Sequence, residues 1–468
     1  MSTVYDDVAD QTDNFDWKIQ PLAAIWVTRA IEALSARNPV IARLANELRT
    51  HTGTRLVDWV DHLALCDSDS LGLIGELADV GYQCESQDDH TVWRHTLGMF
   101  PPVIVNCGRT GIAIRCECIE ACIMALPPIL GIKRVDAEQI IGVRGGTYRH
   151  VLLDGHTDAA LWAVERHGYN QFGSPHASAE QIAAARKHLD AFRAREREFD
   201  RPEDGFAATR PLFQAAAKEI GADWACDLFF QAEREYWQQR NHAGEVQYER
   251  QNRLGLGWAN HDHHTYRSSR AAFPHLISTL EMMGFQCRER FYAGREAGWG
   301  AQVIEQPQAR VVIFADVDLS PEEVANDFAH QPLADRDHLG TVGLWCELHG
   351  EAFLQAGMHH LEAQFDFDAS RDQLAAAGVE TMAPFTYFPH LKQAFTKGEV
   401  WQINPKRCER LLCQGLITPE QCDRFRHDGA IGSHLEILER NDGYKGFNQT
   451  GISEIITRTD PRRMQVAK

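Results

Sequence analysis

The sequence predicts an α+β protein in which one strand–helix–strand–strand–strand unit occurs twice. Two similar segments, GYQCES at 81–86 and GFQCRE at 284–289, each follow a predicted helix. Each helix in turn follows a predicted strand that carries a histidine, His62 in the first unit and His263 in the second. Because the order of elements recurs along with the residues, the pattern indicates duplication of a supersecondary unit.

In both units the pattern changes from strand-like alternation to helical spacing and back. In the first unit, we expect a strand at 56–66, a helix at 71–80 and strands at 82–86, 91–97 and 103–107. In the second unit, we expect a strand at 258–267, a helix at 273–283 and strands at 285–289, 301–305 and 310–315.

The two units divide the chain into five segments. A helical segment is predicted for 1–54, where apolar side chains recur at helical spacing. The first module follows at 55–150 and the second at 251–350. The stretch between them, 151–250, is charged and helical in pattern, so we expect a helical insertion. Capping sequences predict a helical C-terminal region at 351–468, with one closing strand.

Composition narrows the class of protein. The chain has 468 residues, 44% hydrophobic and 24% charged, as in ordinary globular domains. Its 47 Lys and Arg against 66 Asp and Glu give a net charge of −19, which disfavours binding to nucleic acid or an anionic membrane. No apolar run is long enough to span a membrane, and residues 1–16 do not resemble a secretory signal. We therefore expect a cytoplasmic protein, whose oligomeric state the sequence leaves open.

Repeated strands could supply the ligands of a metal ion. Two histidines and one carboxylate can occupy one face of a metal and leave positions open for substrate and O2. His62 and His263, one from the first strand of each module, are the candidate imidazoles. Two acids lie in segments that read as apolar strands, Glu347 in 343–348 and Glu436 in 433–439. A lone acid in an apolar strand must be paired, ligated or pointing outwards, so both are candidate carboxylates.

The second strand carries several histidines, and its alternation divides them between two faces. His261 and His263 are predicted to share one face, which Thr265 and Arg267 continue. His264 is predicted to point the other way, and the pattern does not decide which of the three histidines is the ligand.

Each metal-ligand candidate also has a structural interpretation. His62 could be a buried histidine whose ring bonds a backbone carbonyl, and the HDHH segment at 261–264 could be a surface patch. The pair His359 and His360 follows a predicted helix, and we expect it to be solvated.

Four short motifs occur in order between about 55 and 455. They are HLALC at 62–66, DHHTYR at 262–267, CELHGEAF at 346–353, and HLEIL at 434–438 with Gly451-Ile452. In order and spacing they resemble the motifs H-G-A-I-R, N-H-L-T-P-R, G-E-x-E-Q-R-G-x-A-L and H-F-E-A-L of the 2-oxoadipate dioxygenase/decarboxylase family, also called hydroxyglutarate synthase.

This resemblance implies an iron-dependent enzyme with two vicinal-oxygen-chelate modules that form a shared half-barrel cavity. It implies an oxidoreductase that converts a 2-oxo acid and O2 into a 2-hydroxy acid one carbon shorter and CO2. Fe(II) would be held by His62, His263 and Glu347. Arg267 would orient the substrate, and Glu436 and His434 would position a ligand or water.

The sequence departs from the family at the end of the first motif. Cys66 stands where the family has an arginine, which is thought to hold a substrate carboxylate. Because a thiol cannot replace a guanidinium fork, the substrate need not be 2-oxoadipate itself.

Two other classes of function remain open on the same scaffold. One is a different metal-dependent enzyme, such as an isomerase, a lyase or a ring-cleaving enzyme, and the other is a non-catalytic protein that binds a small molecule. A nucleotide-binding enzyme is disfavoured, because neither the phosphate-binding nor the dinucleotide-binding glycine spacing is present.

Overall fold

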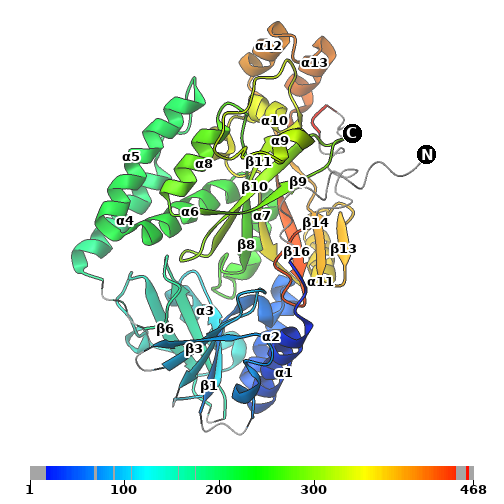
Figure 1. Ribbon diagram of the computed structural model, residues 1–468. Helices are drawn as coiled ribbons and strands as arrows, with labels where there is room; N and C mark the ends of the chain where they lie inside the picture. The colour runs from blue at the N-terminus through cyan, green and yellow to red at the C-terminus, as the bar shows by residue number, and fades with distance from the viewer. Residues whose placement is uncertain are drawn as a thin grey trace.

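Two open β-sheets organise the chain, and the two are set apart from one another in space (Figure 1). The computed structural model describes residues 17–67, 71–87, 90–106, 108–156, 158–173, 175, 177–448 and 460–462. Cys107, which ends a predicted strand, and Gly451 and Ile452 of the fourth motif lie outside this part of the chain.

The first sheet has seven strands in the order β2-β3-β4-β1-β5-β7-β6. They are β1 Val60–Cys66, β2 Gln83–Gln87, β3 His90–Arg94, β4 Val103–Asn106, β5 Gly111–Arg115, β6 Tyr148–Asp154 and β7 Ala160–Arg166. The helices of this half are α1 Pro21–Arg37, α2 Pro39–Thr52 and α3 Ile119–Leu130. Short 3-10 turns span Leu56–Trp59, Ile74–Glu76 and Ala137–Gln139.

The second sheet has nine strands in the order β13-β14-β16-β12-β8-β11-β10-β9, with β15 also paired to β16. They are β8 His261–Arg267, β9 Gln286–Tyr292, β10 Trp299–Gln306, β11 Val311–Asp318, β12 His360–Gln364, β13 Thr386–Phe388, β14 Leu391–Phe395, β15 Glu399–Trp401 and β16 Ala430–Arg440.

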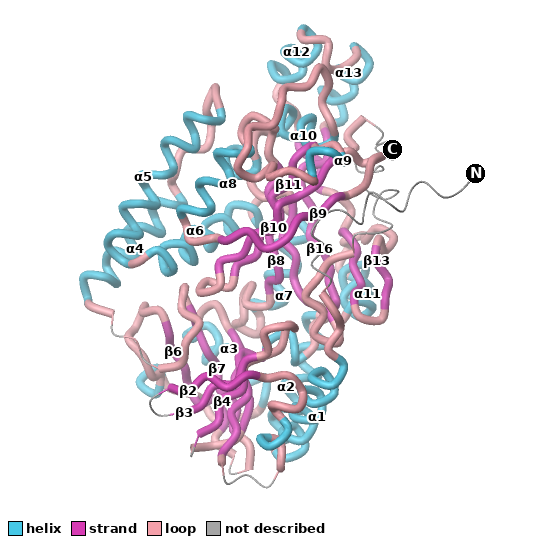
Figure 2. Tube along the Cα trace, in the orientation of Figure 1, coloured by secondary structure: helices cyan, strands magenta, loops and turns pink. Residues whose placement is uncertain are grey.

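Helices lie beside the second sheet and above it in the orientation of Figures 1 and 2. Between the sheets in sequence come α4 Ala179–Arg193, α5 Pro202–Ile220, α6 Ala222–Gln238 and α7 His242–Asn252. The later helices are α8 Phe273–Met282, α9 Pro321–Val324, α10 Thr341–His349, α11 Phe367–Ala376, α12 Pro405–Cys413 and α13 Pro419–Asp428, with a π-turn at Ala352–Ala356. No helix of the described ranges combines the length and apolar character needed to span a membrane.

The α+β class and the repeated module are confirmed. In the first module β1 pairs in parallel with β4, and in the second β8 pairs in parallel with β11. Each sheet also contains a further module of the same kind, in which β5 pairs in parallel with β7 and β12 with β16. The described strands of neither sheet close into a barrel. Each module that the sequence predicts therefore pairs with a neighbour in its own sheet, whereas we had expected the two to share one cavity.

The helix predicted at 71–80 is replaced by a 3-10 turn at Ile74–Glu76. Gly72 adopts φ +69, in the left-handed region that interrupts a right-handed helix, and Gly75 lies within the turn. Each glycine in a helix costs about 1 kcal/mol relative to alanine, so two in so short a segment disfavour a regular helix.

The segment predicted as a strand at 343–348 is instead part of α10. Asp318 accepts hydrogen bonds from the backbone N–H groups of Val342 at 2.9 Å and Gly343 at 2.8 Å, so a side chain from β11 caps this helix. Because α10 is buried on almost every side, its sequence lacks helical periodicity, and a short apolar run cannot distinguish a strand from a buried helix.

The structure also differs from the predicted helical regions around the second module. Strands β6 and β7 extend into the segment at 151–250, and β12 to β15 lie in the C-terminal region where we expected helices and one closing strand. Strands β12 to β15 are three to five residues long, and so short a segment cannot be recognised as a strand from its pattern alone.

The hydrophobic core is divided in the same way as the sheets. Trp59 and Leu63 belong to a cluster that joins α1, α2 and α3 to the first sheet. Phe230 of α6 and Tyr266 of β8 belong to a larger cluster on the second sheet. Each sheet therefore has a core of its own. Burial of each large apolar side chain in these cores contributes about 1.5–3 kcal/mol to the stability of the fold.

A buried ionic network joins the first sheet to α6. Glu165 of β7 accepts two hydrogen bonds at 2.7 Å from Arg149 of β6. His167 lies between two carboxylates, with Nδ1 2.8 Å from Asp227 and Nε2 3.1 Å from Glu165. Burial alone would lower the pKa of His167, but its bonds to Asp227 and Glu165 outweigh burial and raise that pKa to about 10.

We expect the stabilisation from His167 to decline between neutral and alkaline pH. The folded-state pKa lies above the unfolded value, so the contribution is complete below a pH of about 6.5 and is lost as pH rises through the folded value. The gap in melting temperature between the wild type and His167→Gln should therefore narrow from pH 7 to pH 10. Replacing exposed His242 by Gln is the control. A gap that stays constant would show that His167 is not a buried cation.

Candidate metal centre

Three neighbouring strands of the second sheet align their polar side chains on one face. Strand β12 lies between β8 and β16, with Glu362 opposite His263 on one side and Glu436 on the other. Two residues earlier on β12, His360 lies opposite Thr265 of β8. Side chains two residues apart in a strand share a face, so this pairing gathers imidazoles and carboxylates from three distant segments.

His263, His360 and Glu436 form the cluster best suited to a metal ion. One ligand atom from each lies within 4.8 Å of the others, and all three side chains are buried. His360 Nε2 is 3.1 Å from a Glu436 oxygen and 2.7 Å from the Thr265 hydroxyl. Two imidazoles and one carboxylate on one face correspond to the ligand set of non-haem iron enzymes.

Burial keeps these imidazoles neutral, which is the form that binds a metal. It lowers the pKa of His263 and lowers the pKa of His360 to about 3. An unprotonated ring offers a lone pair on the nitrogen that carries no hydrogen.

A buried ion pair orients His263. Its Nδ1–H lies 3.1 Å from Asp262 Oδ1 and donates to it, which leaves Nε2 as the free lone pair. Arg440, at the end of β16, donates to both Asp262 oxygens at 3.0 and 3.1 Å. Gln364 of β12 donates a further bond at 2.9 Å. Hydrogen bonds of this kind fix the tautomer and ring orientation of metal-binding histidines.

A second buried carboxylate, Glu362, lies beside Glu436 of the cluster. Glu362 and Glu436 both receive hydrogen bonds from Gln393 Nε2, at 3.4 and 3.0 Å. Burial and then the charge of Glu436 raise the pKa of Glu362, and burial raises that of Glu436 to about 7. Glu362 Oε2 is in contact with His263 Nε2 but has no well-formed hydrogen bond among the described residues. A divalent cation would stabilise both acids in their charged form, so this donor set fits a metal.

The cavity at this cluster is small and lined with aromatic rings. Its volume is about 60 Å³. Phe447 covers His263, with ring centres 5.2 Å apart, and packs edge-on against Phe314 at 4.4 Å. The remaining rings that line it are Phe291, Trp299, Phe385 and Phe395. These rings would exclude water from the ligand atoms.

The three residues predicted to bind iron are not brought together. His263 belongs to the cluster, but His62 lies on β1 in the other sheet. Glu347 lies on α10, where it is 32% exposed and accepts a hydrogen bond from Arg410 at 2.6 Å. Among the described residues these three do not form a ligand group, because Glu347 belongs to a helix that faces α12.

The other predicted site residues lie closer to the cluster. Glu436 is one of its three members, and His434 is paired in register with His360. His434 donates from Nδ1 to the Thr396 carbonyl at 2.8 Å, while its Nε2 has no hydrogen-bond partner among the described residues. Arg267 is buried beside Trp345, with 5.7 Å between the guanidinium carbon and the ring centre, and does not line the 60 Å³ cavity. Its role in orienting a substrate therefore stays a prediction.

The predicted sharing of one face by His261 and His263 is wrong. A β-bulge places His261 opposite Ala363, the residue after the partner of His263. The His261 ring consequently lies 5.3 Å from that of His264, on the side of the sheet that carries α6. A bulge adds one residue to a strand and so breaks its alternation, which a sequence pattern cannot anticipate.

The first sheet contains a counterpart of the cluster in which two ligand positions have changed. His62 Nδ1 is 2.8 Å from Asp61, which Arg166 binds through two hydrogen bonds of 2.8 Å, as in the second sheet. However, Gly111 occupies the position that His360 has in the second sheet, and Trp162 occupies the position of Glu436. The first half-barrel thus keeps the orienting device without the metal ligands.

His360 is the ligand that sequence reasoning missed, because we expected it to be solvated. It is buried in β12. ALWAVER at 160–166 and HLEILER at 434–440 end in the same two residues, which indicates a second duplicated pair of modules. That likeness predicts a further strand before HLEILER but does not single out His360.

Neither a protein-family model nor a curated protein matches this sequence. Among solved structures, a mutant of 4-hydroxymandelate synthase from Streptomyces coelicolor is similar at 12% identity and TM-score 0.28, over 87% of this chain and 99% of that one. A xylose isomerase-like TIM barrel/4-hydroxyphenylpyruvate dioxygenase fusion protein matches at 10% identity and TM-score 0.23, over 92% and 59%. Methylmalonyl-CoA epimerase from Mycobacterium tuberculosis matches at 13% identity and TM-score 0.23, over 39% of this chain and 88% of that one. At such low scores these likenesses carry no argument, and the function proposed below rests on the cluster.

Metal should stabilise the folded chain through this cluster. We expect a divalent ion at about 100 times its Kd to raise the free energy of unfolding by about 3 kcal/mol, because it binds the folded state alone. Thermal melts with and without a chelator measure the shift. His360→Ala should abolish it, whereas Glu347→Ala should keep it. An equal shift in wild type and His360→Ala would place the metal elsewhere.

Proposed function

We propose that the chain is an Fe(II)-dependent oxygenase whose metal is held by His263, His360 and Glu436. The observation that carries the proposal is the convergence of two neutral imidazoles and one carboxylate within 4.8 Å, on one face of three paired strands. Fe(II) bound there would supply open coordination positions for substrate and O2. This ligand set retains one of the three residues that the family resemblance implied.

The reaction we propose converts a 2-oxo acid and O2 into a 2-hydroxy acid one carbon shorter and CO2. The protein's own groups would prepare it. Asp262 holds the His263 ring with its Nδ1 protonated, so that Nε2 is presented to the metal. Gln393 holds the Glu436 carboxylate in place. The surrounding rings exclude water, which protects a reactive centre from side reactions.

The lining of the cavity supports a substrate with an apolar or aromatic side chain. Six aromatic rings border it, and no Lys or Arg side chain of the described residues lines it to bind a second carboxylate. Cys66, which replaces the family's arginine, lies on β1 in the other sheet and does not line this cavity. A dicarboxylate such as 2-oxoadipate would therefore require Arg267, which is buried nearby, to turn towards the cavity.

Anaerobic purification with metal quantitation, followed by O2 uptake across a panel of 2-oxo acids, tests the proposal. We expect one Fe(II) per chain and uptake with release of CO2, faster for apolar and aromatic side chains than for 2-oxoadipate. Bound metal without O2 uptake would instead favour an isomerase or lyase. Ligand binding that survives loss of all three metal ligands would favour a non-catalytic binding protein.

Substitutions separate the two candidate ligand sets. We expect His360→Ala and Glu436→Gln to lose bound iron. Loss of a residue that only supports a metal ligand reduces activity by roughly 10- to 100-fold, and we expect these two substitutions to reduce O2 uptake by more than that. The matched controls His62→Ala and Glu347→Ala should keep iron and activity, because neither side chain reaches the cluster. Loss of iron in the two controls, with retention in the first pair, would restore the ligand set that the resemblance implied.

A further inference from the structure

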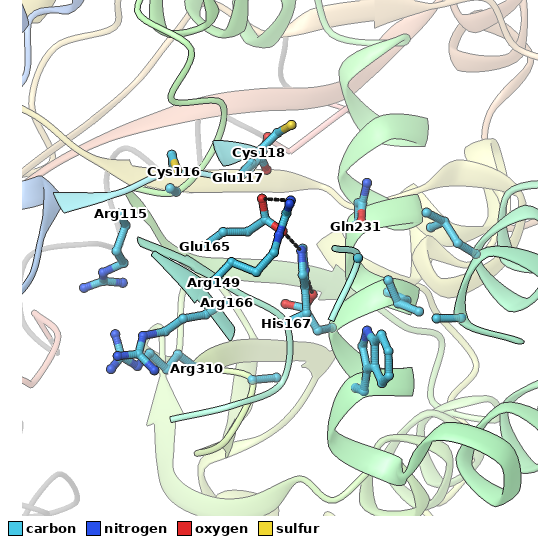
Figure 3. A pocket seen from close by; sticks show the side chains of 18 of the residues that line it. Arg115, Cys116, Glu117, Cys118, Arg149, Glu165, Arg166, His167, Gln231 and Arg310 are labelled. Carbon is cyan, nitrogen blue, oxygen red and sulfur yellow. Dashed lines mark hydrogen bonds and ion pairs between the residues drawn. The ribbon is translucent and has the colours of Figure 1, made fainter. Parts of the chain in front are cut away.

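A second cavity, of about 300 Å³, lies between the two sheets and is lined by residues of both halves of the chain. Strands β5 and β7 contribute Arg115 and Arg166, α6 contributes Arg234, and the turn before β11 contributes Arg310. His261 also lines this cavity, on the face of β8 opposite His263, so the cavity is separate from the metal cluster. Figure 3 shows Arg115, Arg166 and Arg310 gathered on one side of it.

The arginines of this cavity gather around a single buried carboxylate, Asp61. Arg166 donates to both of its oxygens at 2.8 Å, and Arg310 Nη1 donates to one at 3.1 Å. Arg115 Nε is 4.0 Å from the same oxygen. Three guanidinium groups thus face one carboxylate, which leaves two positive charges in excess.

The second sheet provides an internal comparison, because it contains the same histidine–aspartate–arginine arrangement without the excess positive charge. There Asp262 is held by a single arginine, Arg440, and by the neutral amide of Gln364. Gln364 and Arg115 occupy equivalent positions, at the ends of β12 and β5. Orienting a histidine therefore requires one arginine, and the two additional guanidinium groups at Asp61 need another explanation.

The acids that line the cavity do not neutralise this excess, since each has a cation of its own. Glu165 pairs with Arg149 at 2.7 Å, and Asp227 pairs with His167 at 2.8 Å. Glu117 lies 3.8 Å from Arg234. The excess positive charge beside Asp61 is therefore local.

Arg115 and Arg310 have donors to spare. In the described part of the chain, Arg115 has no hydrogen bond from its guanidinium group, and its Nε is buried. Arg310 uses Nε on Asn170 at 2.8 Å and Nη1 on Asp61, which leaves Nη2 for another partner. Its backbone adopts φ +54, a left-handed conformation that is unusual for a side chain of this size and that accumulates at functional sites.

We propose that Arg115 and Arg310 bind a phosphate dianion, free or as a monoester, in the cavity between the two sheets. Two guanidinium forks match the oxygens of a phosphate group, and its charge equals the local excess. Burial lowers the pKa of Arg310 to about 9 despite the opposing attraction of Asp61, and repulsion from Arg166 and Arg115 lowers it further. A bound dianion would offset that repulsion and would link β5 of the first sheet to the turn before β11 of the second.

Isothermal titration calorimetry of the full chain with inorganic phosphate tests this site. We expect saturable binding with one phosphate per chain, weakened about tenfold or more by Arg115→Gln because two charge-assisted hydrogen bonds are lost. Arg310→Gln serves as the second variant should Arg115→Gln fail to fold, as judged by circular dichroism. Arg253→Gln, at an exposed arginine, is the matched control and should bind as the wild type does.

Two further titrations define the ligand and the location. Glycerol phosphate in place of inorganic phosphate distinguishes an ester from the free ion, and acetate at equal ionic strength should give no saturable heat. His360→Ala should bind phosphate normally, so a failure of the oxygenase proposal leaves this one standing. Absence of saturable binding in the wild type, unchanged binding in both arginine variants, or loss of binding in His360→Ala would overturn the site.

Discussion

The position of one strand, β12, determines what the second half of the chain can do. It lies between β8 and β16, and its register sets His360 beside Thr265 and sets Glu362 between His263 and Glu436. A shift of one residue would turn every one of these side chains to the opposite face. Backbone hydrogen bonds on both sides hold β12 in this register.

A buried aspartate that joins a histidine to an arginine occurs once in each sheet. In both cases the aspartate precedes the histidine on the first strand, and the arginine ends the last strand of the second module. The device therefore ties the two modules of a sheet together and fixes the ring of the histidine. It is also present at His62, where Gly111 and Trp162 occupy the positions of His360 and Glu436, so the ring is oriented there without the rest of the cluster.

The chain distributes its charge unevenly. Its net charge is −19, yet three arginines surround Asp61 between the sheets. Burying a charged side chain away from water costs on the order of several kcal/mol unless a partner of opposite charge compensates it. The acidic surface therefore says little about the ligands of the interior. The metal cluster has more buried acid than base, and the arginine cavity has the reverse, so the two sites favour ligands of opposite sign.

The sequence by itself determined the α+β class and the duplicated module, and it marked His263 and Glu436 as candidates, because strand–helix order and polar residues within apolar strands leave local signals. It did not find His360, because HLEAQ at 360–364 alternates as a half-exposed strand does, although both faces of that strand are buried. It assigned Glu347 to a strand because a buried helix loses its periodicity. Tertiary structure decided which histidines meet. Ligand geometry depends on the register between strands about a hundred residues apart, and that register is set by backbone pairing and by a bulge at β8, neither of which is written in the spacing of residues along the chain.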